Sequence, residues 1–193
     1  MSLRSLANYP SQAASFLRGW FHTLVLHNRS QLAGRWRARI YRTPCFIDTA
    51  VVVVNPDNFR AEPGSALYHA CYILNTHGRV SLGPGSHLGA HCYVNAGYGA
   101  VTIGAGVAIG PGTKIFSYSN HYARGAAVTR EYVTRDVRIG DNVLIGANCT
   151  VLPGSVIGSN VVVGAGSVVR GNLAPNGIYA GVPGRLVKSG WYE

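Results

Sequence analysis

An aliphatic residue returns every six positions through much of this chain, and this period constrains the fold more than any other feature. The aliphatic positions are Leu82, Leu88, Val94, Ile103, Ile109, Ile115, Ile139, Ile145, Val151, Ile157, Val163 and Val169. A period of six fits neither an amphipathic helix nor a simple alternating strand. It predicts a triangular coil in which each short strand sends one aliphatic side chain inward.

Many of these aliphatic residues are followed by glycine, namely at Gly83, Gly89, Gly104, Gly110, Gly140, Gly146, Gly158 and Gly164. A residue without a Cβ lets the chain turn a corner where a side chain would crowd the neighbouring coil. Three short strands then make one turn of a parallel β-helix, about 18 residues long, and stacked turns bury a continuous aliphatic column. The spacing of nine between Val94 and Ile103 indicates a three-residue slip in residues 95–100.

The composition agrees with a turn-rich β protein of one domain. The chain has 193 residues, of which 25 are Gly and only 12% are charged. The formal net charge of +10 predicts an anionic partner. The cysteines, Cys45, Cys71, Cys92 and Cys149, form no CxxC pair, so we expect free thiols in a reducing cytoplasm.

Residues 1–45 are predicted to form a basic, partly helical N-terminal segment. The apolar stripe within 11–28 predicts an amphipathic helix, and Arg18 and His22 interrupt it, so we expect no transmembrane span. It also lacks a small-residue cleavage site after the apolar run, so we expect no signal peptide. Two interpretations stay open. The helix packs on this protein or a neighbouring subunit, or it lies on a membrane surface with its arginines facing anionic headgroups. The second would place a cytoplasmic protein peripherally at the inner membrane face.

The six-residue rhythm stops between Ile115 and Ile139, where a polar segment surrounds His121. The gap of 24 positions is a whole multiple of six, so the coil resumes in phase. The segment contains Arg124, Arg130, Glu131, Arg135 and Asp136. Because lone buried charges are costly, we predict an extended loop around 116–138 that leaves the prism.

The stretch "IGDNVLIGANCTVLPGSVIGSNVVVGAGSVV" (139–169) and the later "IYAGVPGRLVK" (178–188) resemble the hexapeptide-repeat acyltransferases. Within them the chain is most similar to the galactoside and maltose O-acetyltransferase group and to polysaccharide-modifying relatives of the colanic acid type. The resemblance implies an all-β solenoid, a left-handed parallel β-helix of five to six triangular coils. It assigns 46–188 to this acyltransferase domain and leaves 189–193 as a tail. The handedness comes from the resemblance alone.

The resemblance also implies a chemistry for the interruption. In these enzymes a loop histidine deprotonates the acceptor hydroxyl, and the matching element here is "SNHY", which makes His121 the candidate general base. A neutral imidazole suits this role because its pKa lies near working pH. Asn95, in "YVN", matches an asparagine of the polysaccharide-modifying relatives and would position the acceptor or orient His121. Direct transfer then needs no acyl-enzyme intermediate.

The implied acyl donor is acetyl-CoA, held in a groove between the parallel prisms of a homotrimer. By resemblance, the backbone at Gly110, Ala147 and Ala165 bonds the pantetheine arm, and a larger side chain there would block its approach. The basic residues Arg170, Arg185 and Lys188 are the candidates for contacting its phosphates. The chain departs from its relatives at Arg170–Gly171, where Thr-Lys is common, and at Leu144, where Trp is common.

The resulting function is acetyl-CoA-dependent O-acetylation of a saccharide hydroxyl in bacterial polysaccharide or lipopolysaccharide biosynthesis. N-acetylation of an amino sugar is one alternative, and a non-catalytic scaffold is another. A metal-dependent hydratase like the γ-carbonic anhydrases is the third, since His69, His77, His87 and His91 are candidate ligands. Their spacing does not match the anhydrases, so we expect no metal. Nucleic acid is not an expected partner, because the basic residues form no recognition motif.

Overall fold

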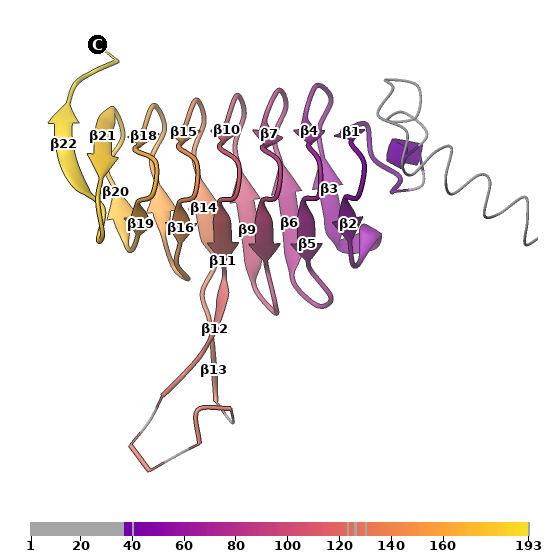
Figure 1. The fold of residues 1–193 in the computed structure, drawn as a ribbon, viewed down its shortest axis with the longest axis horizontal. Helices are drawn as coiled ribbons and strands as arrows, with labels where there is room; N and C mark the ends of the chain where they lie inside the picture. The colour runs from indigo at the N-terminus through magenta and orange to yellow at the C-terminus, as the bar shows by residue number, and fades with distance from the viewer. Residues whose placement is uncertain (1–36, 40, 123, 126, 130, 193) are drawn as a thin grey trace, which may run out of the picture.

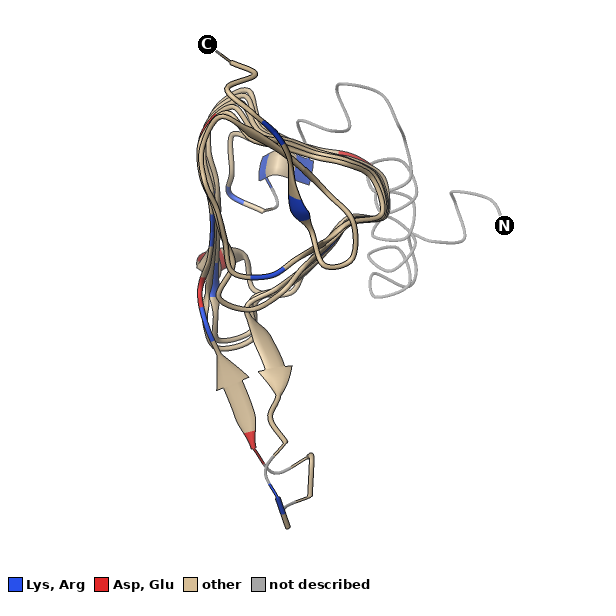
Figure 2. Ribbon diagram, turned by 90° about the vertical axis from the view of Figure 1, so that its left-hand side faces the viewer, with Lys and Arg blue, Asp and Glu red and all other residues tan. Residues whose placement is uncertain are grey.

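The computed structural model describes residues 37–39, 41–122, 124–125, 127–129 and 131–192. The N-terminal helix expected within 11–28 lies outside these residues. The described chain winds into a three-sided prism built from short parallel strands, as the ribbon shows from the side and nearly end-on (Figures 1 and 2). This architecture confirms the predicted left-handed parallel β-helix.

Each coil contributes one strand to each of three faces. The first face contains β1 (Phe46–Ile47), β4 (Ala66–Leu67), β7 (His87–Leu88), β10 (Ala108–Ile109), β15 (Leu144–Ile145), β18 (Val162–Val163) and β21 (Gly177–Ala180). The second contains β2 (Val52–Val53), β5 (Tyr72–Leu74), β8 (Tyr93–Asn95), β11 (Lys114–Phe116), β16 (Thr150–Val151) and β19 (Val168–Val169). The third contains β3 (Phe59–Ala61), β6 (Arg79–Leu82), β9 (Ala100–Ile103), β14 (Val137–Ile139), β17 (Val156–Ile157) and β20 (Asn172–Leu173).

The second and third faces have six strands each, so the described chain completes six coils, numbered here from the N-terminus. We call the edge between the first and second faces the first corner, that between the second and third faces the second corner, and the remaining edge the third corner. A 3-10 turn, η2 (Pro56–Asn58), occupies the second corner of coil 1. Beyond β21 the chain reverses into β22 (Arg185–Ser189), which pairs antiparallel with β21.

The six-residue period places its aliphatic residues in the interior. On the first face, Ile109 pairs with Leu88 on one side and Ile145 on the other, and all three are at most 1% exposed. Because strands on a face lie about 4.8 Å apart, the inward side chains form a continuous stack. Burial of this stack is the main favourable term for the fold.

The coil length varies, and the variation is concentrated at the second corner. Leu67 pairs with Leu88, 21 positions later, whereas Ile145 pairs with Val163, 18 positions later. The predicted slip in residues 95–100 lies at this corner, where the chain makes a turn at Gly97–Tyr98. The same corner of coil 4 carries the predicted excursion. Extra residues are therefore admitted at one edge of the prism.

All four cysteines are free and buried. Burial raises the pKa of the Cys45 thiol to about 11, so this thiol is neutral at physiological pH. The described part of the chain contains no helix long and apolar enough to cross a membrane.

Candidate active site

The interruption around His121 is a β-hairpin that leaves the prism at the second corner of coil 4 (Figure 1). Its strands, β12 (Tyr118–Asn120) and β13 (Tyr132–Thr134), are antiparallel, with Asn120 opposite Tyr132. His121 follows β12 directly, and its backbone N–H donates to the carbonyl of Glu131 at 2.8 Å. The imidazole is exposed and stacks on Tyr122, with ring centroids 5.9 Å apart. The hairpin thus carries His121 away from the prism.

Aromatic rings stiffen the base of this hairpin. Tyr118 stacks on Tyr132 across the two strands, with centroids 5.3 Å apart. Tyr118 also contacts Tyr98 of the preceding coil at 6.0 Å, and Tyr98 stacks on His77 at 4.9 Å. The contact between Tyr118 and Tyr98 thus joins the base of the hairpin to the preceding coil.

A cleft of about 420 Å³ opens where the hairpin meets the prism. Its walls are Asn95, Phe116, Tyr118, Ser119, Asn120, Leu152 and Pro153. The Oδ1 atom of Asn95 is buried and has no hydrogen-bond partner among the residues that the structure describes. Since a buried polar atom without a partner costs about 1–3 kcal/mol, this oxygen is a candidate contact for a bound ligand. Asn95 and the residue that precedes His121 therefore share one cleft.

The first corner carries a second arrangement, in which groups inside the prism orient the peptide that follows each corner glycine. In four successive coils a buried thiol or hydroxyl donates to the carbonyl of that glycine. The pairs are Cys71 with Gly89 (3.1 Å), Cys92 with Gly110 (3.3 Å), Thr113 with Gly146 (3.0 Å) and Cys149 with Gly164 (3.2 Å). Because a trans peptide holds its C=O and N–H on opposite sides, the next residue's N–H points outward.

The residues that follow these glycines are Ala90, Pro111, Ala147 and Ala165. Within the described chain, the amide nitrogens of the three alanines donate to no protein acceptor, and Pro111 has no N–H. The third corner differs, because the amide of Ala105 donates to Asp141 Oδ1 at 2.7 Å and that of Asp141 donates to Ser159 Oγ at 3.0 Å. Within the described chain, three first-corner amides are therefore open, whereas two of the equivalent third-corner amides are engaged by side chains.

Glycine keeps the amides of Ala147 and Ala165 uncovered. A Cβ on Gly110 would lie 2.5 Å from the amide nitrogen of Ala147, and a Cβ on Gly146 would lie 2.5 Å from that of Ala165. The amide of Gly110 is itself occupied, since it donates to the carbonyl of Ile145 at 2.7 Å. Gly110 can therefore admit a ligand closely, while the free hydrogen-bond donors belong to Ala147 and Ala165.

The internal hydroxyl of Thr113 yields a stability prediction. Thr113 is fully buried, donates to the carbonyl of Gly146 and accepts from the amide of Cys149 at 3.2 Å. Thr113→Val should lower the free energy of unfolding by about 1–3 kcal/mol, because two buried backbone groups lose their partner. Thr113→Ser, which keeps the hydroxyl, is the matched control in urea denaturation. Equal unfolding midpoints for the two variants would contradict the prediction.

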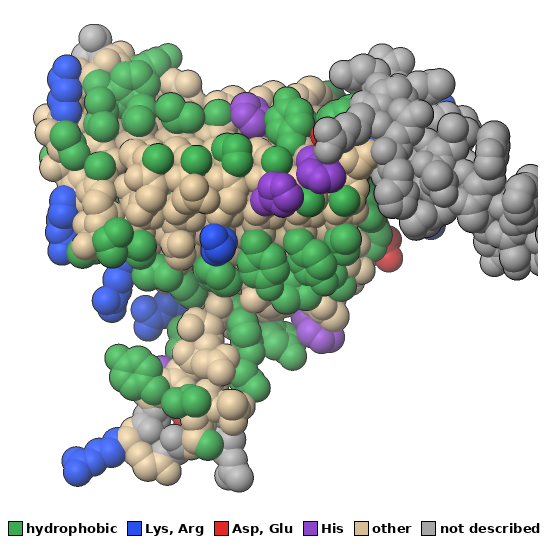
Figure 3. Space-filling view, viewed as in Figure 1, with side chains coloured by type: hydrophobic (Ala, Val, Ile, Leu, Met, Phe, Trp, Pro, Cys, Tyr) green, Lys and Arg blue, Asp and Glu red, His purple; other side chains and the backbone are tan. Residues whose placement is uncertain are grey.

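A cleft of about 440 Å³ continues the first corner toward the N-terminal coils. It is lined by Asp48, Tyr68, His69, His87, Gly89, Ala90, Ala108, Ile109, Gly110, Pro111 and Leu144. His69 holds the corner position that Ala90 holds one coil later, and its Nδ1 lies 2.7 Å from Thr49 Oγ1. The run of small corner residues therefore ends at this imidazole. Histidine side chains gather on the N-terminal half of the face seen in Figure 3.

The three predicted basic residues are exposed at the C-terminal end of the prism, but they occupy different edges. Arg185 pairs with Ala180, which lies one coil beyond Gly164 at the end of the first corner. Lys188 pairs with Ile178 near the other end of β22, and Arg170 follows β19 at the second corner. Figure 3 shows Lys and Arg side chains at this end. The structure aligns Arg185 alone of these three with the open amides.

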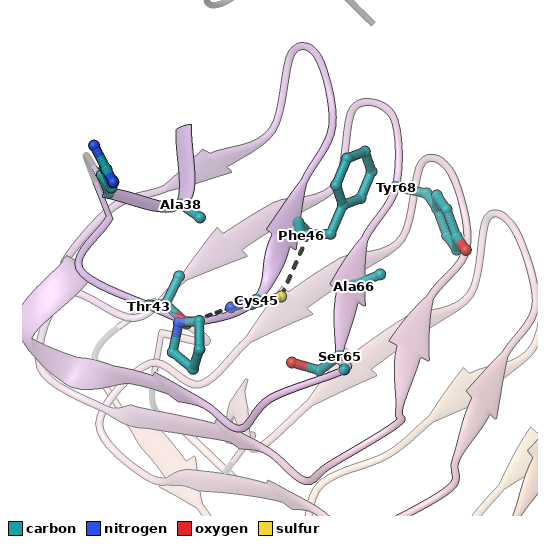
Figure 4. A pocket seen from close by; sticks show the side chains of 10 residues that line it. Ala38, Thr43, Cys45, Phe46, Ser65, Ala66 and Tyr68 are labelled. Atoms are coloured by element: carbon teal, nitrogen blue, oxygen red, sulfur yellow. Dashed lines mark hydrogen bonds between the residues drawn. The ribbon is translucent and has the colours of Figure 1, made fainter. Parts of the chain in front are cut away.

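Another cavity, of about 570 Å³, lies at the N-terminal end between β1 and β4 (Figure 4). Ala38, Thr43, Cys45, Phe46, Ser65, Ala66 and Tyr68 are among its lining residues. The polar groups drawn there are engaged locally, since the Cys45 amide donates to Thr43 Oγ1 and its thiol to the carbonyl of Phe46. This cavity contains none of the predicted site residues.

For the metal alternative, the histidines of coils 2 and 3 are the relevant group. His69 and His91 have ring centroids 5.5 Å apart at the first corner, whereas His87 lies on β7 against Tyr68. The described residues contain no group of three or more His, Cys, Asp or Glu side chains arranged to hold a metal ion.

The predicted residues thus form two sets in a single chain. Gly110, Ala147 and Ala165 come together at the first corner, with Arg185 at its end, while Asn95 lies with the hairpin of His121 at the second corner. Figure 2 shows the hairpin projecting from one corner of the triangular section. The two sets flank opposite edges of the second face. One chain does not bring them together.

Sequence reasoning missed the open amide of Ala90 and the internal donors. A signal was present, because Cys92, Thr113, Cys149 and Ser167 each stand three residues after a corner glycine. Read together with the six-residue period, that spacing points these polar side chains inward beneath the corner.

Residues 136–171 match the family model described as bacterial transferase hexapeptide (six repeats). A curated relative, the putative lipopolysaccharide biosynthesis O-acetyl transferase WbbJ of Escherichia coli (strain K12), is 42% identical over 52 residues. That match covers 27% of this chain and 26% of the relative, about a quarter of its length.

Two solved structures extend the similarity to the whole fold. AntD, an N-acyltransferase from Bacillus cereus in complex with dTDP and 3-hydroxybutyryl-CoA, is 25% identical with a TM-score of 0.67. The similarity covers 75% of this chain and 79% of that one. The hexapeptide-repeat acetyltransferase VCA0836 of Vibrio cholerae O1 biovar eltor, complexed with acetyl coenzyme A, is 22% identical with a TM-score of 0.61. It covers 95% of this chain and 91% of that one, and at this identity it supports the fold alone.

Proposed function

We propose that this chain transfers an acetyl group from acetyl-CoA to a hydroxyl group of a saccharide. The observation that carries the proposal is the pair of outward amides at Ala147 and Ala165, on successive coils, which donate to no acceptor among the described residues. The names of two similar proteins support the same reaction class, since one is an O-acetyl transferase and the other an N-acyltransferase in complex with 3-hydroxybutyryl-CoA.

The spacing of the two amides suits the pantetheine arm. Successive coils lie about 4.8 Å apart. The arm has two amide carbonyls whose carbon atoms are four bonds apart, which is also about 4.8 Å if bonds project as in an extended backbone. Each carbonyl can therefore accept from one corner amide, the pantoyl carbonyl from Ala165 and the β-alanyl carbonyl from Ala147. This orientation directs the phosphate end of the coenzyme toward Arg185.

The same arithmetic places the sulfur. It lies four bonds beyond the β-alanyl carbonyl, so it reaches about one coil further, to the level of Gly110 and Pro111. The 440 Å³ cleft begins at those residues. The thioester would thus face the space between Gly110 and His69, where an acceptor can enter.

We further propose that a second copy of the chain completes the site, in a homotrimer. Within one chain, His121 projects from the second corner, whereas the thioester would lie at the first. A neighbouring prism packed side by side can bring its hairpin to this first corner. His121 is exposed, and Asn95 Oδ1 has no partner within the described part of the chain, which accords with groups that meet their ligands only in the assembly.

In that assembly the chemistry is a direct transfer. His121 takes the proton of the acceptor hydroxyl as its oxygen attacks the acyl carbon, and Asn95 positions the acceptor or the imidazole. The new C–O bond forms while the carbonyl electrons move onto oxygen. When the carbonyl re-forms, the C–S bond breaks, and the imidazolium returns the proton to the departing CoA thiolate. No nucleophile of the protein is consumed.

N-acetylation of an amino sugar is the second candidate, favoured by the likeness to an N-acyltransferase at 25% identity. We favour a hydroxyl because the more similar curated relative is named an O-acetyl transferase, and its name suggests a glycan of lipopolysaccharide biosynthesis as acceptor. An amine acceptor would use the same groove and the same base. The two therefore differ in the acceptor alone.

The testing experiment measures CoA thiol release from acetyl-CoA across a panel of saccharides, with each amino sugar matched to its hydroxyl analogue. We expect turnover with a hydroxyl acceptor, an O-acetyl product by NMR, and a trimeric mass by light scattering. Turnover restricted to amino sugars would establish the second candidate. Bound zinc together with carbon dioxide hydration and no CoA binding would replace both with the hydratase.

A further inference from the structure

The open amide of Ala90 has no place in the binding of the pantetheine arm, yet it belongs to the same row. We propose that this N–H stabilises the negative charge that develops on the thioester carbonyl oxygen during transfer. The inference rests on the proposed function. It assigns a hydrogen-bond donor to the developing oxyanion, for which the proposed mechanism names no partner.

Orientation of the amide comes from inside the prism. The carbonyl of Gly89 accepts from the buried Cys71 thiol at 3.1 Å, so the N–H of Ala90, on the opposite side of that peptide, points outward. Among the described residues it has no acceptor. Ala90 and Gly89 both line the 440 Å³ cleft. The donor is therefore preorganised and faces the space where the acyl group would lie.

Position along the corner distinguishes this amide from the other two. The order of corner residues by coil is Ala165, Ala147, Pro111 and Ala90. Pro111 has no N–H, so there is no donor at the level of the sulfur. In the proposed pose the acyl carbon would lie about 6 Å beyond the β-alanyl carbonyl, since five bonds separate them. Ala90 lies two coils, or about 9.6 Å, beyond Ala147, so a carbonyl oxygen turned along the corner would approach its N–H.

A donor fixed in this way acts mainly on the transition state. The carbonyl oxygen gains charge as the acceptor oxygen bonds to the acyl carbon, and a preorganised N–H stabilises that charge without reorganising. One corner feature differs from the other coils, because Tyr68 takes the place of glycine beside Ala90. Its ring lies over the first face between Phe46 and His87, with centroids 6.4 and 5.6 Å away. Tyr68 also lines the 440 Å³ cleft, so its side chain forms the wall beside Ala90.

Ala90→Pro removes the N–H donor, and the chain already contains a proline at the equivalent corner position of another coil. Pro111 holds the equivalent position one coil later, also preceded by glycine, and the next residues have similar positive φ angles, 60° at His91 and 71° at Gly112. The matched control is Ala105→Pro in the same coil. Ala105 holds the third-corner position that Pro84 occupies one coil earlier, and it lies outside both clefts. Ala105→Pro should therefore keep the turnover of the wild type.

For Ala90→Pro we expect kcat to fall about 10²- to 10³-fold, with the dissociation constant for acetyl-CoA within about threefold of wild type. A kcat equal to that of Ala105→Pro would overturn the proposal. So would an unchanged kcat with weakened acetyl-CoA binding, because the amide would then serve the arm and not the oxyanion. If Ala90→Pro does not fold, L-lactic acid incorporated at position 90 replaces only the N–H by oxygen. The same fall in kcat is expected, and its absence overturns the proposal.

Failure of the proposed function is seen separately. A wild-type protein that transfers no acyl group to any acceptor contradicts that function before the variants are compared. A wild type that transfers, beside an Ala90→Pro variant with the same kcat, contradicts only the role of this amide.

Discussion

His121→Ala should reduce kcat for acetyl transfer by about 10²- to 10⁴-fold while leaving the affinity for acetyl-CoA unchanged. The imidazole is the only side chain of the described hairpin tip that ordinarily exchanges a proton near neutral pH, and its ring makes no hydrogen bond within the described chain. Removing it deprives the acceptor hydroxyl of its proton acceptor without disturbing the prism. Steady-state kinetics with acetyl-CoA and the best acceptor of the panel measure the effect.

The matched control for this variant is His77→Ala. His77 is an exposed histidine at the same corner, stacked on Tyr98 of the hairpin's aromatic base, and it has no place in the mechanism. We expect its kcat to equal that of the wild type. If His121→Ala and His77→Ala have the same kcat, the base must be sought elsewhere, and the cleft histidine His69 becomes the first candidate.

Proline substitutions at Ala147 and Ala165 should instead weaken the binding of acetyl-CoA and have a smaller effect on kcat. Ala147→Pro and Ala165→Pro each remove one amide donor and leave one pantetheine carbonyl without a partner, which costs about 1–3 kcal/mol. The dissociation constant for acetyl-CoA should therefore rise about tenfold for each and about 100-fold for the double variant. Turnover at saturating acetyl-CoA should fall much less than in His121→Ala.

Calorimetric titration with CoA measures these constants, and Ala105→Pro again controls for the strain of a corner proline. An unaltered dissociation constant in the double variant would exclude the first corner as the pantetheine groove. Such a result would make the 420 Å³ cleft beside Asn95 the next place to test for coenzyme binding.

Much of the fold could be predicted from the sequence because, in a solenoid, the position of each residue follows from a short repeat along the chain. The inward position of Ile109 or Ile145 depends only on a six-residue phase, and the phase also revealed the slip at 95–100 and the excursion of 116–138. The grouping of Gly110, Ala147 and Ala165 follows from the same repetition. Each position is determined by its equivalents one coil away.

What the sequence could not provide is the relation between edges of the prism. The basic residues Arg170, Arg185 and Lys188 are close in sequence number and all near the end of the solenoid, yet they lie at different edges. Arg170 follows β19 at the second corner, whereas Arg185 and Lys188 lie toward opposite ends of β22. Whether an amide is open or engaged depends on side chains one coil away, such as Asp141 beneath Ala105. Those contacts depend on which side chains lie next to each other in adjacent coils, which the six-residue period does not specify.

The hairpin of His121 leaves the prism between β11 and β14, and both strands keep the pairing of an uninterrupted coil. Ile115 still pairs with Val94 and Val151, and Ile139 still pairs with Ile103 and Ile157, as though the intervening residues were a simple turn. Insertions and deletions within that appendage would leave the stack of coils intact. Evolution or protein design could therefore replace the hairpin that contacts the acceptor without changing the β-helix.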